Sequence, residues 1–100
     1  MLLYLENNFH QKITTQILSK VFHLHCNYIA ESMKEIFGKT AMEMLTEIRM
    51  NAAKKYLLRT DKSVEEIARL VGYSTDVYFS GQFRKHEGIS PSYYRKQYKS

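Results

Sequence analysis

The stretch SVEEIARLVGYS, residues 63–74, decides the fold of this chain. Ser63 can cap a helix, and Glu66 three positions later completes the capping-box pattern. Ala68 is small enough to let a second helix cross close by. Gly72, four residues later, tolerates the left-handed backbone that ends a helix abruptly. With a second amphipathic helix opening directly afterwards, the pattern predicts a helix-turn-helix, the motif that carries a helix into the DNA major groove.

The chain contains this unit twice. TTQILSKVFHL, residues 14–24, aligns with SVEEIARLVGY, residues 63–73, at an offset of 49. Further on the offset is 50, so that Gly38 corresponds to Gly88. The extra residue falls near the start of the second helix of the second unit. Such internal repetition predicts one supersecondary unit used twice, and the alternative is two ordinary helical hairpins in a bundle.

Length and composition point to one folded domain. The chain has 100 residues, of which 44% are apolar and 25% charged, so it can fold without disulfides. Its single cysteine fits a reducing cytoplasm. The N-terminal stretch MLLYLENNF lacks the basic region of a signal peptide. Apolar runs fall short of the roughly 18 residues of a membrane span, so we expect no membrane partner. Together with the DNA-binding motif, the single cysteine leads us to expect a cytoplasmic, nucleoid-associated protein.

The net charge of +5 is placed unevenly. Residues 1–50 hold five Lys/Arg and five Asp/Glu, whereas residues 51–100 hold ten and five. The second half therefore supplies the whole excess of positive charge. A basic surface attracts polyanions such as nucleic acid, although many folded domains are equally basic.

The apolar periodicity predicts an all-α chain of about seven helices. The first is short for a stable helix, which suggests that it begins upstream of this sequence. Expected helical segments are residues 2–9, 14–22, 26–37 and 41–58, two helices within 63–88, and a last helix that begins at Ser90-Pro91. Side chains expected to face inward include Leu2, Leu5, Phe9, Ile17, Leu18, Val21, Ile29, Met33, Phe37, Tyr78, Phe79 and Phe83.

The segment Ala41 to Leu58 contains neither Gly nor Pro and reads as one long helix. It is apolar on two faces, which predicts packing against two partners. We interpret it as a connector between a first unit, residues 1–38, and a second unit, residues 61–100. Its 18 residues would span about 27 Å, somewhat less than the ~34 Å of one turn of B-DNA. Two recognition helices at its ends could therefore enter successive major grooves.

Three stretches together resemble the AraC/XylS family of bacterial transcription regulators: ITTQILSKVFHL (13–24), EIRMNAAKKYLL (47–58) and SVEEIARLVGYSTDVYFSGQFRKHEGISPSYYRKQY (63–98). The resemblance covers essentially the whole chain. It implies two helix-turn-helix subdomains joined by a long helix, which bind promoter or operator DNA as the C-terminal domain of a larger regulator. It also implies a sensor or dimerisation domain in that regulator, and RNA polymerase is a further candidate partner.

Helical geometry gives the positions of the two recognition helices that face away from the core. In the first unit they match the base-contacting positions of the family. The base-reading candidates are Asn27, Ala30, Glu31, Asp76, Val77, Ser80 and Gly81. Where the family often has Arg, this chain has Glu31 and Gly81. Glu31 can accept from a cytosine amino group but repels phosphate, so it is either a base reader or a solvated surface residue. Gly81 lets the backbone approach closely and weakens the helix.

Candidates for contacts with the DNA backbone combine cations with hydroxyl groups. Arg84 and Lys85 end the second recognition helix, where they can bind phosphate or satisfy the helix dipole. Arg49 can form an internal ion pair or touch DNA, and the sequence leaves both open. The phosphate candidates are Thr15, Lys34, Ser74, Thr75, Arg84 and Lys85.

Other functional classes find little support. The sequence lacks G-x-G-x-x-G, G-x-x-x-x-G-K-S/T and H-E-x-x-H, and we expect neither an enzyme nor catalytic residues. His23-Leu24-His25-Cys26 resembles a ligand cluster but lacks a partner pair at metal-site spacing, so we expect no metal and no cofactor. The competing hypothesis is a protein-interaction module that kept the fold but lost base readout, for which Glu31 and Gly81 are the best support.

Overall fold

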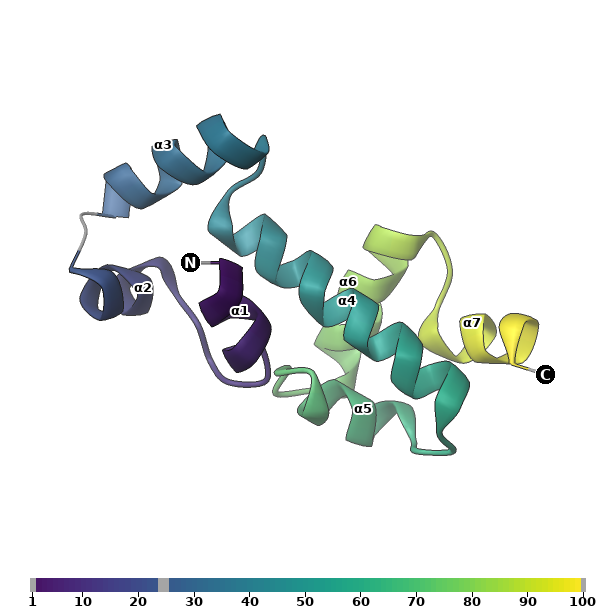
Figure 1. Ribbon diagram of the computed structural model, residues 1–100. Coiled ribbons are helices and arrows are strands. Elements are labelled where there is room, and N and C mark those ends of the chain that lie inside the picture. Colours follow the sequence, from purple (N-terminus) through teal and green to yellow (C-terminus); the bar gives the residue numbers. More distant parts are fainter. Residues whose placement is uncertain (1, 24–25, 100) are drawn as a thin grey trace. The chain divides into compact units, whose positions relative to one another are not determined.

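The computed structural model describes residues 2–23 and 26–99, and these residues form an all-helical structure (Figure 1). Within the described residues the helices are α1 (Leu2–Asn8), α2 (Thr15–Phe22), α3 (Cys26–Phe37), α4 (Ala41–Arg59), α5 (Val64–Leu70), α6 (Asp76–Glu87) and α7 (Pro91–Tyr98). The predicted fold class is confirmed, with two helix-turn-helix units joined by one long helix. The chain divides into two compact units, residues 1–48 and 49–100, so the boundary falls inside α4.

Side-chain caps fix where the helices begin. Three residues at the predicted helix starts, Thr14, Ser63 and Ser90, act as N-caps, and each accepts a hydrogen bond from the backbone N–H three residues on, at 3.1 Å. Thr75 caps α6 in the same way, again at 3.1 Å. Each bond satisfies one of the N–H groups that a first helical turn leaves without a partner. The predicted helix starts are therefore confirmed.

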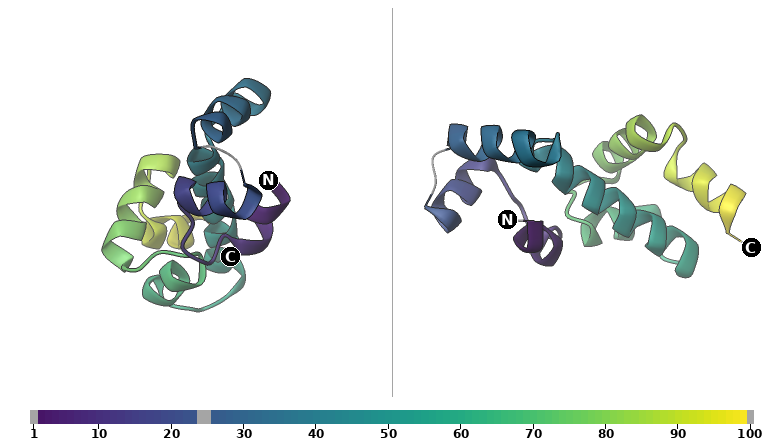
Figure 2. Two further views of the ribbon diagram at one scale, coloured as in Figure 1. Left: turned by 90° about the vertical axis from the view of Figure 1, so that its left-hand side faces the viewer. Right: turned by 45° about the horizontal axis from the view of Figure 1, so that its top comes forward.

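The long helix α4 begins with a reciprocal capping box that the sequence analysis missed. The Thr40 hydroxyl accepts from the Glu43 N–H, and the Glu43 carboxylate accepts from the Thr40 N–H, both at 3.1 Å. These bonds from Thr40 hold the pKa of Glu43 below its ordinary value. From there α4 continues without interruption to Arg59, one residue beyond the predicted end (Figure 2).

The first unit closes around the N-terminal part of α4. Its core consists of Leu5, Ile13, Leu18, Met33, Ala41, Met44 and Leu45. Phe22 packs on this core, and its ring lies edge-on against Tyr4 with 5.5 Å between centroids. Val21 was predicted to face inward but is 43% exposed, because α2 turns the larger Phe22 toward the core instead. Phe37 is also more exposed than expected, since it ends α3 where the chain turns at Gly38 (φ 73°).

The second unit closes around the C-terminal part of α4. Its fully buried side chains include Met50, Ala53, Leu57, Ile67, Ala68, Val71, Phe79, Phe83 and Pro91. An aromatic series continues this core from α6 into α7, with ring centroids 5.5 Å apart for Phe83–Tyr94 and 4.8 Å apart for Tyr94–Tyr98. The prediction that Tyr78 is a core residue was wrong. Phe79 and Phe83 set the buried side of α6, which leaves Tyr78 58% exposed.

Arg95 of α7 and Lys99, the residue directly after α7, bind the C-terminal end of α4. The Arg95 guanidinium donates from Nε to the Leu57 carbonyl at 3.0 Å and from Nη2 to the Thr60 carbonyl at 3.2 Å. Lys99 donates to the same Thr60 carbonyl at 2.7 Å and pairs with Asp61. The last carbonyls of a helix carry partial negative charge and lack intrahelical donors. Arg95 and Lys99 therefore serve the fold, because they tie α7 to the end of α4.

Replacing Arg95 by Met should remove these charge-assisted bonds and lower the free energy of unfolding by about 1.5–3 kcal/mol. Lys96→Met is the matched control, since Lys96 is exposed on the same helix. Urea unfolding followed by circular dichroism measures both variants. An equal loss of stability in the two variants would contradict the assigned role of Arg95.

Candidate nucleic-acid interface

The turn between α5 and α6 has the geometry that the sequence predicts. Gly72 adopts the left-handed conformation with φ 98°. The Tyr73 N–H donates to the Ala68 carbonyl at 2.8 Å, and the Gly72 N–H donates to the Arg69 carbonyl at 3.1 Å. This pair of bonds defines a Schellman motif, in which glycine avoids the steric cost of positive φ. The motif stops α5 and directs the chain into α6.

In the first unit His23 takes the place of that glycine. Its φ is 54° and its ψ 38°, and its N–H donates to the Ser19 carbonyl, so the first unit also ends its first helix at a left-handed residue. Leu24 and His25 lie outside the described residues, and with them much of the cluster considered as a metal site. Among the described residues, no group of three or more His, Cys, Asp or Glu side chains could hold a metal ion.

The face of α6 that points away from the core is open to solvent. Phe79 and Phe83 are fully buried on the opposite side. Of the four predicted base-reading positions, Asp76, Val77 and Gly81 are exposed and Ser80 is half-buried. Val77 is 78% exposed, a high value for an aliphatic side chain on a folded domain. The side chains at these four positions supply one carboxylate, one hydroxyl and one apolar group, and none of the four is a cation.

The corresponding face of α3 is described only in part. Glu31 and Lys34 are exposed, while Met33 is buried beneath them. The side chains of the other two predicted base-reading residues, Asn27 and Ala30, lie outside the description of the structure. For α3, the structure thus supports the accessibility of Glu31 and Lys34.

The phosphate candidates of the second unit lie around the two ends of α6. Ser74, Thr75, Arg84 and Lys85 are all exposed. The Thr75 oxygen accepts the capping bond from α6, and the hydroxyl keeps its own proton to donate to a phosphate. The Thr15 side chain, the candidate in the first unit, lies outside the described part of the chain.

Several cations of the second unit are occupied within the protein. Lys54 pairs with Glu87 at 2.9 Å and Arg69 with Glu65 at 2.7 Å, in addition to the α7 cations that bind the end of α4. Burial alone would raise the pKa of Glu87, but the hydrogen bonds from Lys54 and His86 outweigh it and lower that pKa. The formal charge of this half therefore overstates the charge available for DNA. The exposed Arg84 and Lys85 supply a larger share of that available charge than of the formal charge.

Arg49 is engaged with the turn of the second unit. Its guanidinium carbon lies 5.3 Å from the centroid of the Tyr73 ring, a cation–π geometry. Burial lowers the pKa of Arg49, and Tyr73 opposes this shift. Burial likewise raises the pKa of the Tyr73 phenol against the influence of Arg49. The sequence left open whether Arg49 forms an internal contact or touches DNA. The structure answers this in part, since Arg49 contacts Tyr73, the residue that follows Gly72.

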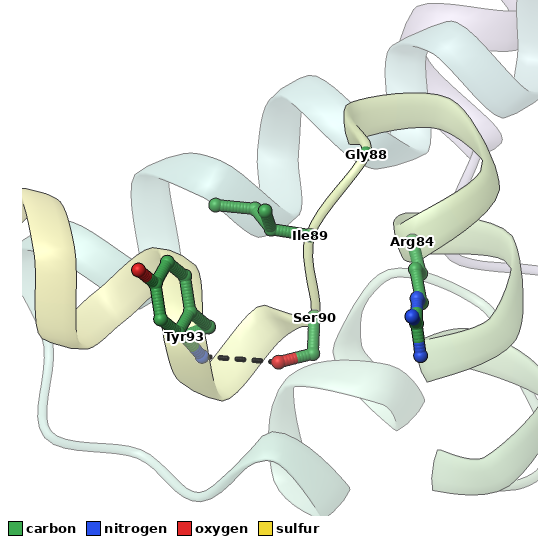
Figure 3. A pocket seen from close by; sticks show the side chains of 5 residues that line it. All are labelled: Arg84, Gly88, Ile89, Ser90 and Tyr93. Atoms are coloured by element: carbon green, nitrogen blue, oxygen red, sulfur yellow. Dashed lines mark hydrogen bonds between the residues drawn. The ribbon is translucent and has the colours of Figure 1, made fainter.

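A surface hollow of about 360 Å³ lies where α6 passes into α7 (Figure 3). Arg84 of α6 borders it on one side and Tyr93 of α7 on the other, with Gly88, Ile89 and Ser90 between them. The Ser90 hydroxyl accepts from the Tyr93 N–H, so it acts within the fold. The hollow lies beside the cation expected to bind phosphate.

Comparison with known proteins agrees with this geometry. A family profile described as a helix-turn-helix domain matches residues 18–97. The C-terminal domain of AraT, a response regulator from Geobacillus stearothermophilus, is 33% identical with a TM-score of 0.97, over 99% of this chain and 83% of that one. The chain belongs to the AraC/XylS family. It is the helix-turn-helix DNA-binding domain of a transcription regulator.

Longer regulators contain the same domain. YisR of Bacillus subtilis, an uncharacterised regulator, is 37% identical over 93% of this chain and 32% of its own length. AdaA of the same species, a bifunctional transcriptional activator and DNA repair enzyme, is 34% identical over 96% of this chain and 46% of its own. The chain thus spans about a third to a half of these curated relatives. No helix among the described residues is long and apolar enough to cross a membrane.

Some interactions in the structure were not predicted from the sequence, and they differ in whether a local sequence pattern marks them. The Thr40/Glu43 capping box follows the T-x-x-E pattern and could have been read from the sequence. The contacts of Arg95 and Arg49 join residues far apart in the chain, and no local signal marks them. They became apparent only once the helices were packed.

Gly81 offers a direct test of the exposed face of α6. A Cβ added at Gly81 meets nothing within 4 Å, so Gly81→Ala should raise the free energy of unfolding by about 0.5–1 kcal/mol. Gly88→Ala is the control and should destabilise the protein, because Gly88 has φ +86°. Thermal unfolding by calorimetry measures both, and a destabilised Gly81→Ala variant would show that this face is covered.

Proposed function

We propose that the chain binds double-stranded DNA sequence-specifically, with α3 and α6 in successive major grooves. The observation that supports this most is the repeated helix-turn-helix, whose second copy presents an exposed α6 face opposite the buried Phe79 and Phe83. A recognition helix needs one face anchored in a core and the other accessible to base edges. Both conditions hold for α6.

The length of α4 supports the spacing of the two half-sites. Its 19 residues extend about 28 Å, and one turn of B-DNA rises about 34 Å. We expect recognition helices joined by a connector of this length to enter successive major grooves on one side of the duplex. A continuous helix also limits the variation in spacing, so we expect a preferred distance between half-sites.

The chemistry of the exposed faces gives a base preference. The exposed carboxylates of Glu31 and Asp76 can accept from the amino group of cytosine. Val77 suits the methyl group of thymine, and Gly81 permits close approach of the helix backbone. Positions 31 and 81 hold Glu and Gly, so neither has the arginine that favours guanine. We therefore expect cytosine and thymine at the positions that face these side chains.

The rest of the regulator is proposed from its relatives. The names of several relatives describe operon regulators, among them those for raffinose in Pediococcus pentosaceus and melibiose in Escherichia coli. We infer that the domain works with a sensor or dimerisation domain, acts at promoters with RNA polymerase, and resides in the cytoplasm at the nucleoid. The name of AdaA includes a repair enzyme, but we propose no enzymatic role for this domain.

A protein-interaction module is the second candidate function. Glu31 is exposed on α3, where a carboxylate repels the phosphates on either side of the groove. Gly81 lacks any side chain for base contact. If base readout has been lost, the exposed faces would instead bind a protein surface. Measurements of DNA binding separate the two candidates, as follows.

Removing Arg84 and Lys85 together should weaken binding to all DNA sequences alike. Each lost phosphate contact reduces the log–log salt slope by about 0.9, so the double alanine variant should flatten it by about 2. Lys12→Ala with Lys20→Ala, in the electrically neutral half, should change the slope less. Fluorescence anisotropy over a salt series gives these slopes, and circular dichroism confirms folding.

An equal or larger effect of the Lys12/Lys20 pair would overturn the assignment of the second unit as the electrostatic anchor. Absence of wild-type binding to any duplex at low salt would favour the interaction module. A tandem fusion of two copies of the chain, which raises the effective concentration, distinguishes weak binding from none.

Glu31→Arg should tighten binding to unrelated DNA, because it removes a repelling charge and adds an attracting one. It should also change the preference at one base pair of the first half-site by about 1–3 kcal/mol. Competition titrations with a selected site and a scrambled duplex measure both effects. Unchanged affinity for both duplexes would mean that Glu31 faces away from DNA.

A further inference from the structure

Two tyrosines occupy the same place on the two recognition helices. With the offset of 50 residues, Tyr28 corresponds to Tyr78. Each is the third residue of its helix, since α3 begins at Cys26 and α6 at Asp76. Each is 58% exposed, although tyrosine is a large and partly apolar side chain. This recurrence suggests that the exposed position serves a common purpose in both units.

The ring of Tyr78 is anchored while its edge remains accessible. The ring lies 5.6 Å from that of Tyr73, which is itself 7% exposed and covered by Arg49. Arg49, Tyr73 and Tyr78 thus form a series of contacts that runs from α4 through the turn to the surface of α6, with the two rings tilted by 49°. An anchored phenol loses little conformational freedom when its hydroxyl binds a partner.

The place of Tyr78 on α6 favours the DNA backbone over the base edges. At 100° per residue, Tyr78 lies on the flank beside Val77, and Lys85, seven residues later, lies on the same flank. Lys85 is exposed there and is a candidate for phosphate binding. On α3 the residue seven after Tyr28 is Glu35, whose exposed carboxylate repels phosphate, so of these two side chains only the Tyr28 hydroxyl can donate to a phosphate.

We propose that Tyr28 and Tyr78 are a matched pair of phosphate contacts. Each donates its hydroxyl to a backbone phosphate beside the groove that its helix enters, and the two bonds set how deeply the helices insert. This inference rests on the proposed DNA binding. Hydroxyl donors to phosphate fix register and orientation without carrying sequence information. They also add no charge, which separates them from Arg84 and Lys85.

The variants Tyr28→Phe and Tyr78→Phe remove one oxygen each and keep the rings. Each should lower affinity about 3- to 10-fold, to the same extent on a selected site and on a scrambled duplex, with the log–log salt slope unchanged. Tyr98→Phe is the control, because Tyr98 is 57% exposed on α7. Fluorescence anisotropy gives the affinities, and thermal unfolding confirms that each variant folds.

Duplexes with single methylphosphonate substitutions identify the phosphate itself. One substituted position should weaken wild-type binding and have no further effect on Tyr78→Phe, and a second should behave likewise for Tyr28→Phe. Affinities of both variants within 1.5-fold of wild type would overturn the proposal. A loss confined to the selected site, or an equal loss in Tyr98→Phe, would also overturn it. If the wild type binds no duplex, the proposed function fails and this inference fails with it.

Discussion

Each helix-turn-helix unit builds its core on one of the two apolar faces of α4. Met44 and Leu45 of this helix belong to the core of the first unit, and Met50, Ala53 and Leu57 are buried in the second. Short helices such as α2 and α5, of 8 and 7 residues, are marginal alone and gain their stability from tertiary packing. A helix that is apolar on two sides must in turn be covered on both. The two helix-turn-helix units and the connector therefore require one another.

The charges of the second unit divide into structural and accessible groups. Arg95 and Lys99 satisfy the carbonyls at the end of α4, and Lys54 pairs with Glu87. These cations raise the net charge of the chain but are committed to the fold. The cations at the end of α6, Arg84 and Lys85, are exposed, as are Lys55, Arg59, Lys62 and Lys96. Apart from Arg69, which pairs with Glu65, these six side chains are the accessible positive charges among the described residues of the second unit. Net charge alone would not have revealed this distribution.

Local signals predicted most of the fold, and long-range packing accounts for what they missed. Helix starts and turns depend on caps and left-handed residues, so the roles of Ser63 and Gly72 could be predicted correctly from the sequence. The rotation of a helix about its axis depends on which neighbour fills the core. For that reason the exposure of Val21 and Tyr78 could not be predicted from periodicity. The exposed face of α6 was predicted, but the contact between Arg49 and Tyr73 that supports it joins residues 24 positions apart and has no local sequence pattern.

The central claim is that one chain reads two half-sites through two linked recognition helices. Selection of bound duplexes from a random pool, followed by sequencing, tests it most directly. We expect two short blocks of sequence whose centres lie about 10–10.5 base pairs apart, with a fixed distance between them. The block read by α6 should contain thymine and cytosine at the positions facing Val77 and Asp76. A single block, two blocks at variable spacing, or no enrichment over the starting pool would contradict the account.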